Sequence, residues 1–402
     1  MKKELALKIF EGFSIERWND LVRPFDLVEM DKEAEKMVLA YIIGKYEENR
    51  GVDVDWEWMI YACLFDLLKK IALCDIKSPV QRLIHAEYPD EYKKLNNWVV
   101  EQYRTLVTDP DIFNRFAKYV DRTAGCVNDE TARIFRAAHK YSTLRELEMI
   151  SMVNEPERLE KIRKEVNADL NSFLDLRGLQ LLVTKQRPFD FLLRIEQLRF
   201  QTRWNQTPRV PRTSVLGHCF FVAVLTLLLE RESGVAMCPR RLYNNYFSAL
   251  FHDLPEAVTR DIISPVKQAT HGLPSIVKDI EDQIVSKELV PLMEDFYRDE
   301  ILFFTNDEFE NRVVVDGETT VVTFDELNTI YNEDRFCPVD GKIVRLADHY
   351  SALLEADASI NHGITSEHLR TGRDNLIKSY PESKMVNGID AGKLFHAFTE
   401  ER

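Results

Sequence analysis

The chain repeats itself: an ordered series of short motifs in its first half returns in its second half. Chance could produce any one of these matches, but hardly the whole series in the same order. The repeat therefore predicts two copies of one domain, which we place at residues 1–185 and 186–402. The matching segments are R-W-N at Arg17 and Arg203, F-D and H-D at Phe65 and His252, S-P-V at Ser78 and Ser264, and K-Y-S-T-L and H-Y-S-A-L at Lys140 and His349.

Hydrophobic residues recur with helical spacing over most of the chain, which predicts an all-α fold. One stretch differs. Residues 312–324 read RVVVDGETTVVTF, two β-branched runs around Asp316-Gly317 that are typical of a β-hairpin. We place this hairpin in an insertion of the second copy near residues 296–340. The clearest helical segments are Lys32 to Tyr46, Trp56 to Ile71, His218 to Leu229 and Leu242 to Phe251.

The two copies differ in residues that could bind a metal. Such residues are grouped in the second copy and largely missing from the first, as expected of a copy relieved of catalysis. The alternative is that they were never ligands and vary freely. We interpret the first copy as degenerate, a scaffold that covers an apolar face of the second. The paired positions are His218 and Ala34, His252 and Phe65, Asp253 and Asp66, Glu256 and Lys69, and Asp348 and His139.

Three predicted helices of the second copy carry the candidate ligands. His218 lies on one apolar helix, and His252-Asp253 close another, immediately before Pro255, which cannot continue that helix. Asp348 lies on a third helix. Two imidazoles and two carboxylates suit a borderline divalent ion such as Mn, Fe, Co, Ni or Zn. The alternative is a buried histidine–aspartate network joined by hydrogen bonds.

The order H…HD…D on these helices resembles the HD-domain metal-dependent phosphohydrolases. An R-W pair ahead of the first histidine, H-D-x-x-E-x-x-x-x-D and a following P-V-K turn are similar to the 5'-deoxynucleotidase-like branch of that superfamily. The resemblance covers roughly residues 190–360, and residues 1–150 only as a degenerate copy. The residues that carry it are Arg203, Trp204, His218, His252, Asp253, Glu256, Asp261, Pro265, Val266, Lys267 and Asp348.

The resemblance implies hydrolysis of a phosphate ester at one divalent metal, held by His218, His252, Asp253 and Asp348. Two further histidines, His271 and His349, fit no ligand pattern; we take them as a loop residue and a helix-surface residue.

Glu256 falls one helical turn after Asp253 and would transfer a proton or orient water. Asp261 would be its partner or an anchor for substrate. In the alternative interpretation, Glu256 is an acid that stabilises a helix N-terminus.

Five positions besides these are candidates for substrate binding. Arg203 could clamp the phosphate with two hydrogen bonds, and Lys267 could add a point charge. Trp204 could stack on a base or sugar, although a tryptophan is more often a core residue. Thr213 and Ser214 precede the His218 helix; they either face the nucleotide or cap that helix.

Composition limits the partners. With 53 Lys+Arg against 67 Asp+Glu, a formal net charge of -14 argues against binding of DNA or RNA polymers. The nearly apolar run Cys219 to Leu229 is far shorter than the roughly 20 residues of a membrane helix. Six scattered cysteines without C-x-x-C indicate reduced thiols, and no signal peptide is visible, so we expect a cytoplasmic protein without a membrane partner. The sequence leaves open whether the chain forms a homo-oligomer.

The leading hypothesis is a metal-dependent phosphohydrolase that releases phosphate from a (deoxy)nucleoside 5'-monophosphate. A second hypothesis keeps the metal site but takes a nucleoside triphosphate or cyclic nucleotide, since the hairpin insertion could reshape the pocket. A third is a non-catalytic nucleotide-binding regulatory protein, because half of the molecule has lost its ligands. Base and sugar preference and the physiological metal are not readable from the sequence.

Overall fold

The computed structural model describes residues 1–74, 76–121, 129–260, 270 and 272–399, and most of this length is helical. The predicted all-α class is therefore confirmed. In the first half the helices are α1 (Lys3–Phe10), α2 (Glu29–Asn49), α3 (Trp56–Leu73), α4 (Ser78–Glu87), α5 (Pro89–Tyr103), α6 (Pro110–Val120), α7 (Asp129–Ser151), α8 (Pro156–Asn171), α9 (Arg177–Val183) and α10 (Arg187–Phe200).

The second half adds three small antiparallel pairings of strands to its helices. Its helices are α11 (Val215–Glu230), α12 (Pro239–Phe251), α13 (Glu256–Thr259), α15 (Leu273–Glu288), α16 (Asp295–Thr305), α17 (Phe324–Thr329), α18 (Gly341–Asn361), α19 (Glu367–Ser379) and α20 (Ala391–His396). Its strands are β1 (Asn311–Val315), β2 (Glu318–Val321), β3 (Val339–Asp340), β4 (Met385–Val386) and β5 (Ile389–Asp390).

The predicted hairpin is confirmed. β1 and β2 pair antiparallel, with Val315 opposite Glu318, so Asp316 and Gly317 form the two-residue turn. Both turn residues have positive φ, 50° and 83°, which a turn of this length requires and which Asp and Gly tolerate best. β1 also pairs with β3, which runs directly into α18. The insertion is thereby joined to the start of that helix.

Polar side chains begin several helices by accepting hydrogen bonds from otherwise unpaired backbone N–H groups. Asp55 accepts from the N–H of Trp58 at the start of α3, and Ser214 accepts from that of Gly217 at the start of α11. α12 ends at Phe251, and Pro255 directly precedes α13, as predicted from the position of the proline. His252 and Asp253 therefore lie in the bend between two helices.

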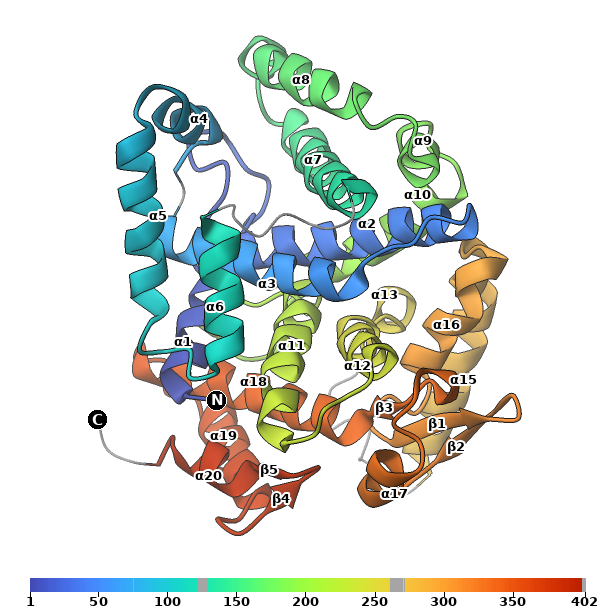
Figure 1. Cartoon of the computed structure of the whole chain (residues 1–402). Helices are drawn as coiled ribbons and strands as arrows, with labels where there is room; N and C mark the ends of the chain where they lie inside the picture. Colours follow the sequence, from blue (N-terminus) through green and yellow to red (C-terminus); the bar gives the residue numbers. More distant parts are fainter. Residues whose placement is uncertain (75, 122–128, 261–269, 271, 400–402) are drawn as a thin grey trace.

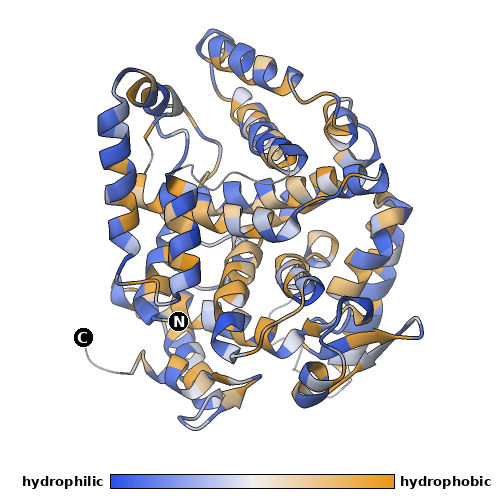
Figure 2. Ribbon diagram, viewed as in Figure 1, coloured by the Kyte–Doolittle hydropathy of each residue, from blue (hydrophilic) through white to orange (hydrophobic). Residues whose placement is uncertain are grey.

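α2 lies across the middle of the molecule, between α7 on one side and α11 on the other (Figure 1). α11 in turn packs against α12 and α18. Figure 2 shows that α11 is apolar along nearly its whole length, whereas α5 and α8 at the periphery are largely hydrophilic. Burial matches this pattern, because every residue of α11 is buried.

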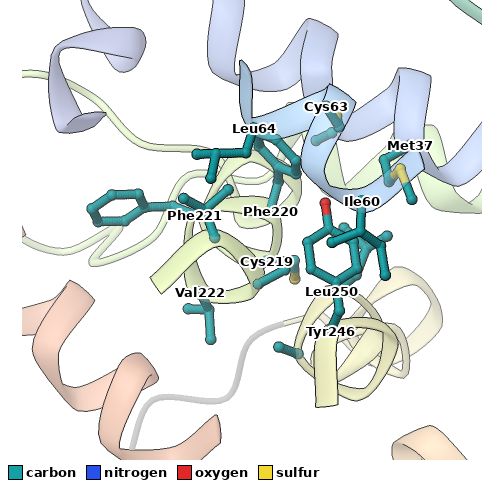
Figure 3. Packing of buried hydrophobic residues seen from close by; sticks show 14 of the residues in the cluster. Met37, Ile60, Cys63, Leu64, Cys219, Phe220, Phe221, Val222, Tyr246 and Leu250 are labelled. Atoms are coloured by element: carbon teal, nitrogen blue, oxygen red, sulfur yellow. The ribbon is translucent and has the colours of Figure 1, made fainter. Parts of the chain in front are cut away.

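One hydrophobic cluster extends through both halves of the chain. Figure 3 shows Met37 of α2 and Cys63 of α3 facing Phe220 of α11 and Leu250 of α12. The two predicted domains thus bury apolar surface against each other, which stabilises the pair by the hydrophobic effect. The division at residues 185 and 186 remains a prediction.

Buried ion pairs also join the helices of the two halves. Arg199, at the end of α10, is fully buried and bonds to Glu35 of α2 at 2.9 Å and to Glu146 of α7 at 2.5 Å. On the same helix Glu196 pairs with Arg145 of α7 at 2.7 Å. These pairs fix α10, which leads into the second half, against the helices of the first half.

Among the residues that the structure describes, none of the helices combines the length and apolar character that crossing a bilayer requires.

Candidate metal centre

The four predicted metal ligands converge in space. His218 lies in the first turns of α11, His252 and Asp253 in the bend after α12, and Asp348 in the first half of α18. Their helices pack directly on one another, so three distant segments meet at one place. The convergence that sequence order alone could only suggest is therefore present in the fold.

The distances within this group are short. His218 Nε2 lies 3.1 Å from Asp348 Oδ1 and 3.8 Å from Asp253 Oδ2. His252 Nε2 lies 3.3 Å from Asp253 Oδ2. Ligand atoms of His218, His252 and Asp348 all lie within 4.8 Å of one another. A single ion could contact them all with small side-chain movements.

The two imidazoles are oriented by their other ring nitrogens. His252 Nδ1 donates to the carbonyl of Ala249 at 2.7 Å, and His218 Nδ1 lies 3.0 Å from Ser351 Oγ. Both Nε2 atoms are buried, and neither has a hydrogen-bond partner within the described residues. Buried polar atoms are rarely left unpaired, and metal-bound histidines are commonly held by their second nitrogen in this way. The residues present therefore fit a divalent cation.

The electrostatics agree with this fit for Asp253, Asp348 and His218. At His252 the charge of Asp253 outweighs burial and raises the imidazole pKa well above its ordinary value, so a bound cation would displace a proton there. Burial acts to raise the pKa of Asp253, but the charges of His252, His218 and Arg203 outweigh it and lower the pKa to about 2. Burial likewise opposes ionisation of Asp348, yet His218 and Arg203 hold its pKa far below the ordinary value. Burial and the charge of Arg203 lower the pKa of His218, which keeps its nitrogen neutral. Two anionic oxygens and a neutral imidazole are thus available at neutral pH.

Arg203 lies against the candidate ligands, on the loop before α11. Its guanidinium nitrogens are 3.5 Å from Asp253 Oδ2, 3.9 Å from Asp348 Oδ1 and 3.3 Å from Glu355 Oε1. The neighbouring Trp204 donates its indole N–H to Glu355 at 2.6 Å. Both residues were predicted from the sequence to bind substrate, and the structure brings both to the site.

Thr213 and Ser214 are engaged within the protein. Thr213 is buried and donates its hydroxyl to Glu355 at 3.1 Å. Ser214 caps α11 and donates to Asp31 of the first half, so it has the capping function that was one of its two predicted functions. Glu256 begins α13, three residues after Asp253. Asp261, Lys267 and His271 lie outside the described residues, so their predicted functions stay predictions.

His349 differs from its expectation as a helix-surface residue. It is half-buried, and its Nδ1 lies 2.8 Å from the hydroxyl of Tyr380. It follows Asp348 directly but points to a different neighbour.

Two residues of the site, Glu355 and Cys219, were not predicted from the sequence. Glu355 is fully buried and accepts hydrogen bonds from Trp204 and Thr213 while it pairs with Arg203. The repeat carried a signal for it, because Y-S-T-L-R-E in the first copy and Y-S-A-L-L-E in the second both end on a glutamate, Glu146 and Glu355. Cys219 was also missed; with His252 and Asp253 it forms a second group of ligand atoms within 4.8 Å of one another.

This geometry defines a helical protein with a buried histidine–aspartate site for a divalent cation. Residues 195–377 match the family model described as HD domain, and all four candidate ligands lie in that range. The match supports the HD-domain superfamily for this part of the chain, a class that binds divalent metals and acts in general as a metal-dependent phosphohydrolase. No curated protein matches the chain.

Proposed function

We propose that this chain releases phosphate from a small nucleotide, specifically a (deoxy)nucleoside 5'-monophosphate. The observation that carries the proposal is the position of Arg203. Its guanidinium contacts both candidate metal-binding aspartates, so a phosphate beside the cation would also meet two N–H donors. A fork of this kind suits a phosphate better than a neutral substrate.

His218, His252, Asp253 and Asp348 would hold the cation. When bound, the cation supplies a lowered pKa for a coordinated water and polarises the phosphoryl oxygens. Arg203 binds and orients the phosphoryl group and offsets its charge. Glu355 keeps Arg203 in place through the 3.3 Å contact with its Nε.

The reaction joins a water oxygen to phosphorus and breaks the bond from phosphorus to the ester oxygen. One proton leaves the water, and one reaches the departing alkoxide. Glu256, one turn after Asp253, is the residue that we assign to this proton transfer, with Asp261 as its partner. Trp204 borders the same site, half-exposed, and offers a ring edge to the sugar or base.

We further propose that the first half is a degenerate copy of the HD domain. The pairing of Arg203 and Trp204 with Glu355 has a counterpart in that of Arg17 and Trp18 with Glu146, in which the Trp18 indole donates at 2.8 Å. The isolated β-bridge Glu16–Val28 precedes α2 just as Thr202–Ser214 precedes α11. Trp18 and Trp204 share a positive φ of 57° and 53°. These parallels support the repeat independently of sequence identity.

The parallels revise one pairing from the sequence. Aligned on the bridges and on the first residues of α2 and α11, His218 corresponds to Lys32, two residues before the Ala34 that sequence comparison paired with it. Lys32 is buried and donates to the carbonyl of His139 at 3.0 Å and to Thr143 Oγ1 at 2.9 Å. Lys36, one turn further, binds Asp66 at 2.8 Å. Two lysine amino groups thus lie where the second half would hold its cation. Burial lowers the pKa of Lys32 to about 7, whereas Asp66 and Glu33 keep Lys36 charged.

The direct test strips the protein of metal and adds back Mn, Fe, Co, Ni or Zn, followed by a panel of ribo- and deoxynucleoside 5'-monophosphates. We expect metal-dependent release of inorganic phosphate. Triphosphates and cyclic nucleotides in the same panel decide between the substrate classes. Tight nucleotide binding without turnover under every metal would instead favour a regulatory protein.

Two variants locate the activity. Asp253→Ala should lose both bound metal and phosphate release. Its matched control is Asp66→Asn, the corresponding aspartate of the first half, which should retain both. Phosphate release by Asp253→Ala at the wild-type rate would refute the proposal.

A further inference from the structure

The insertion that carries the hairpin reaches the metal site. Phe309, just before β1, lies with its ring centroid 6.1 Å from that of His252. Its neighbour Glu308 is close enough to His252 and Asp253 for both charges to act on its pKa, which burial raises. This part of the insertion therefore lies beside two candidate ligands, His252 and Asp253.

Several contacts fasten this segment to the start of α18. A Cβ at Gly341 would lie only 2.2 Å from the carbonyl oxygen of Glu310, so the backbone of the insertion occupies the space of a side chain there. Lys342 Nζ pairs with Glu310 at 2.6 Å, and its backbone N–H donates to Asn311 at 3.2 Å. Phe309 is consequently fixed beside the first turns of α18.

Arg345 projects from those turns, three residues before Asp348, and residues at this spacing share one face of a helix. Its guanidinium carbon lies 5.0 Å from the centroid of the Phe309 ring. Its charge also acts on His349 and Tyr380, the neighbours of Asp348. Arg345 is therefore a cation at the rim of the same site.

Arg345 is exposed, and no carboxylate pairs with it in the part of the chain that the structure describes. Arg203, by contrast, is buried among three carboxylates. The two arginines lie on opposite sides of Asp348 along α18, because Arg203 contacts Glu355, two turns beyond it. The Arg203 guanidinium therefore lies at the buried end of the site, and the Arg345 guanidinium lies at its solvent-exposed side.

We propose that Arg345, supported by the ring of Phe309, is a phosphate-binding residue on the solvent side of the metal centre. It captures the phosphoryl group of the substrate and retains the product phosphate, and the insertion exists in part to hold it there. The proposal deepens the phosphohydrolase function and rests on it for the nature of the substrate. An exposed arginine stacked on an aromatic ring keeps its donors free and loses little side-chain freedom on binding.

Binding of inorganic phosphate to the metal-loaded full chain, measured by calorimetry, tests the proposal without requiring turnover. Arg345→Met should weaken phosphate binding about tenfold, and Arg345→Lys should recover part of the loss, since the point charge remains without the fork. Phe309→Leu should weaken binding less, by about threefold. Bound metal should stay at the wild-type level in all three variants.

The matched control is Arg335→Met. Arg335 is exposed and stacked on Phe336 with its guanidinium carbon 4.5 Å from the ring centroid, but it lies in the segment before β3. It should bind phosphate as the wild type does. Equal phosphate affinity in Arg345→Met and wild type, or no phosphate binding by the wild type, would overturn the proposal.

Turnover separates this proposal from the proposed function. If the wild type hydrolyses a nucleotide, Arg345→Met should raise KM about tenfold and change kcat less than threefold, as for an interaction made equally in ground and transition states. A wild type that binds phosphate but hydrolyses no nucleotide would refute the phosphohydrolase function and leave the phosphate site standing. An unchanged KM in Arg345→Met would refute the site alone.

Discussion

Asp31 of α2 accepts a hydrogen bond from the hydroxyl of Ser214, the residue that caps α11. The first half of the chain thereby reaches the N-terminus of the helix that carries His218, four residues further on. Asp31 is buried, and burial raises its pKa to about 6 from the ordinary 3.8. This contact links the two halves at the base of the candidate metal site.

The raised pKa gives Asp31 a defined effect on stability. Between pH 3.8 and about 6 the folded protein holds a proton that the unfolded chain releases. Its contribution is therefore fully present below pH 4 and is lost as the pH rises through 6. Asp31→Asn cannot titrate but can still accept from Ser214. Relative to wild type, its free energy of unfolding should rise by about 2 kcal/mol from pH 4 to pH 7.

Denaturant unfolding at several pH values measures this difference. The exposed Asp325→Asn should give a constant difference over the same range. Asp31→Ala leaves Ser214 without its acceptor and should be less stable than Asp31→Asn at every pH. A pH-independent difference for Asp31→Asn would show that Asp31 does not titrate as stated.

Gly217→Ala should disrupt the contact between the two halves next to His218. A Cβ at Gly217 would lie 2.6 Å from Asp31 Oδ1 and 2.8 Å from Phe13 Cε1, next to His218 in the chain. We expect a loss of about 1–3 kcal/mol in stability, typical of overpacking, together with weaker metal binding. Thermal unfolding with and without metal measures both. Gly272→Ala is the control, since a Cβ there meets nothing within 4 Å.

Glu355→Gln should impair activity while the metal stays bound. Glu355 positions Arg203 and Trp204 but is not itself a candidate ligand. Loss of such outer partners commonly costs about 10- to 100-fold in activity. The corresponding variant of the first half, Glu146→Gln, should lower stability yet leave kcat near wild type below its unfolding temperature. Equal losses of kcat in the two variants would contradict this division.

Metal binding should be limited to one site per chain. The buried amino groups of Lys32 and Lys36 lie where the first half would need a cation, so only the second half should bind one. Elemental analysis should give about one equivalent for wild type and none for His218→Ala. Added metal should raise the Tm of wild type through ligand linkage but not that of His218→Ala. Two equivalents in wild type would contradict the replacement of the cation by lysine.

Arg199 should be necessary for stable packing of the two halves against each other. Arg199→Met removes the buried guanidinium that bonds to both Glu35 and Glu146 and should cost about 3–5 kcal/mol. For the same reason a fragment of residues 187–402 should be unstable, since it exposes Arg199 and the face of α11 that packs on α2. Circular dichroism and solubility of the fragment test this. A folded, fully active fragment would refute the hypothesis that the first half serves as a scaffold for the second.

Much of the fold was predictable because its signals are local. Apolar spacing located the helices that became α2, α3, α11 and α12, and Asp316-Gly317 located the hairpin. Pro255 correctly predicted the break after His252. Each of these features depends on residues within a few positions of one another, where periodicity and turn chemistry act directly.

The convergence of the four candidate ligands was predictable for a different reason. His218, His252, Asp253 and Asp348 form a pattern of residue types whose order resembles a known superfamily, and that order survives without knowledge of distances. Glu355 was not predicted, because the shared Y-S-x-L-x-E pattern marks its position but does not show its partners, Arg203 and Trp204, which only the fold brings around it.

The sequence by itself therefore determined the helical class and the order of the candidate ligands, and it predicted the repeat, all from composition and spacing. Only the tertiary structure decided that Lys32 bonds to His139, that Asp31 reaches Ser214, and that Arg345 lies against the ring of Phe309. These relations join segments far apart in the chain. They arise when buried helices pack to exclude water, which brings charges together at positions that no local pattern specifies.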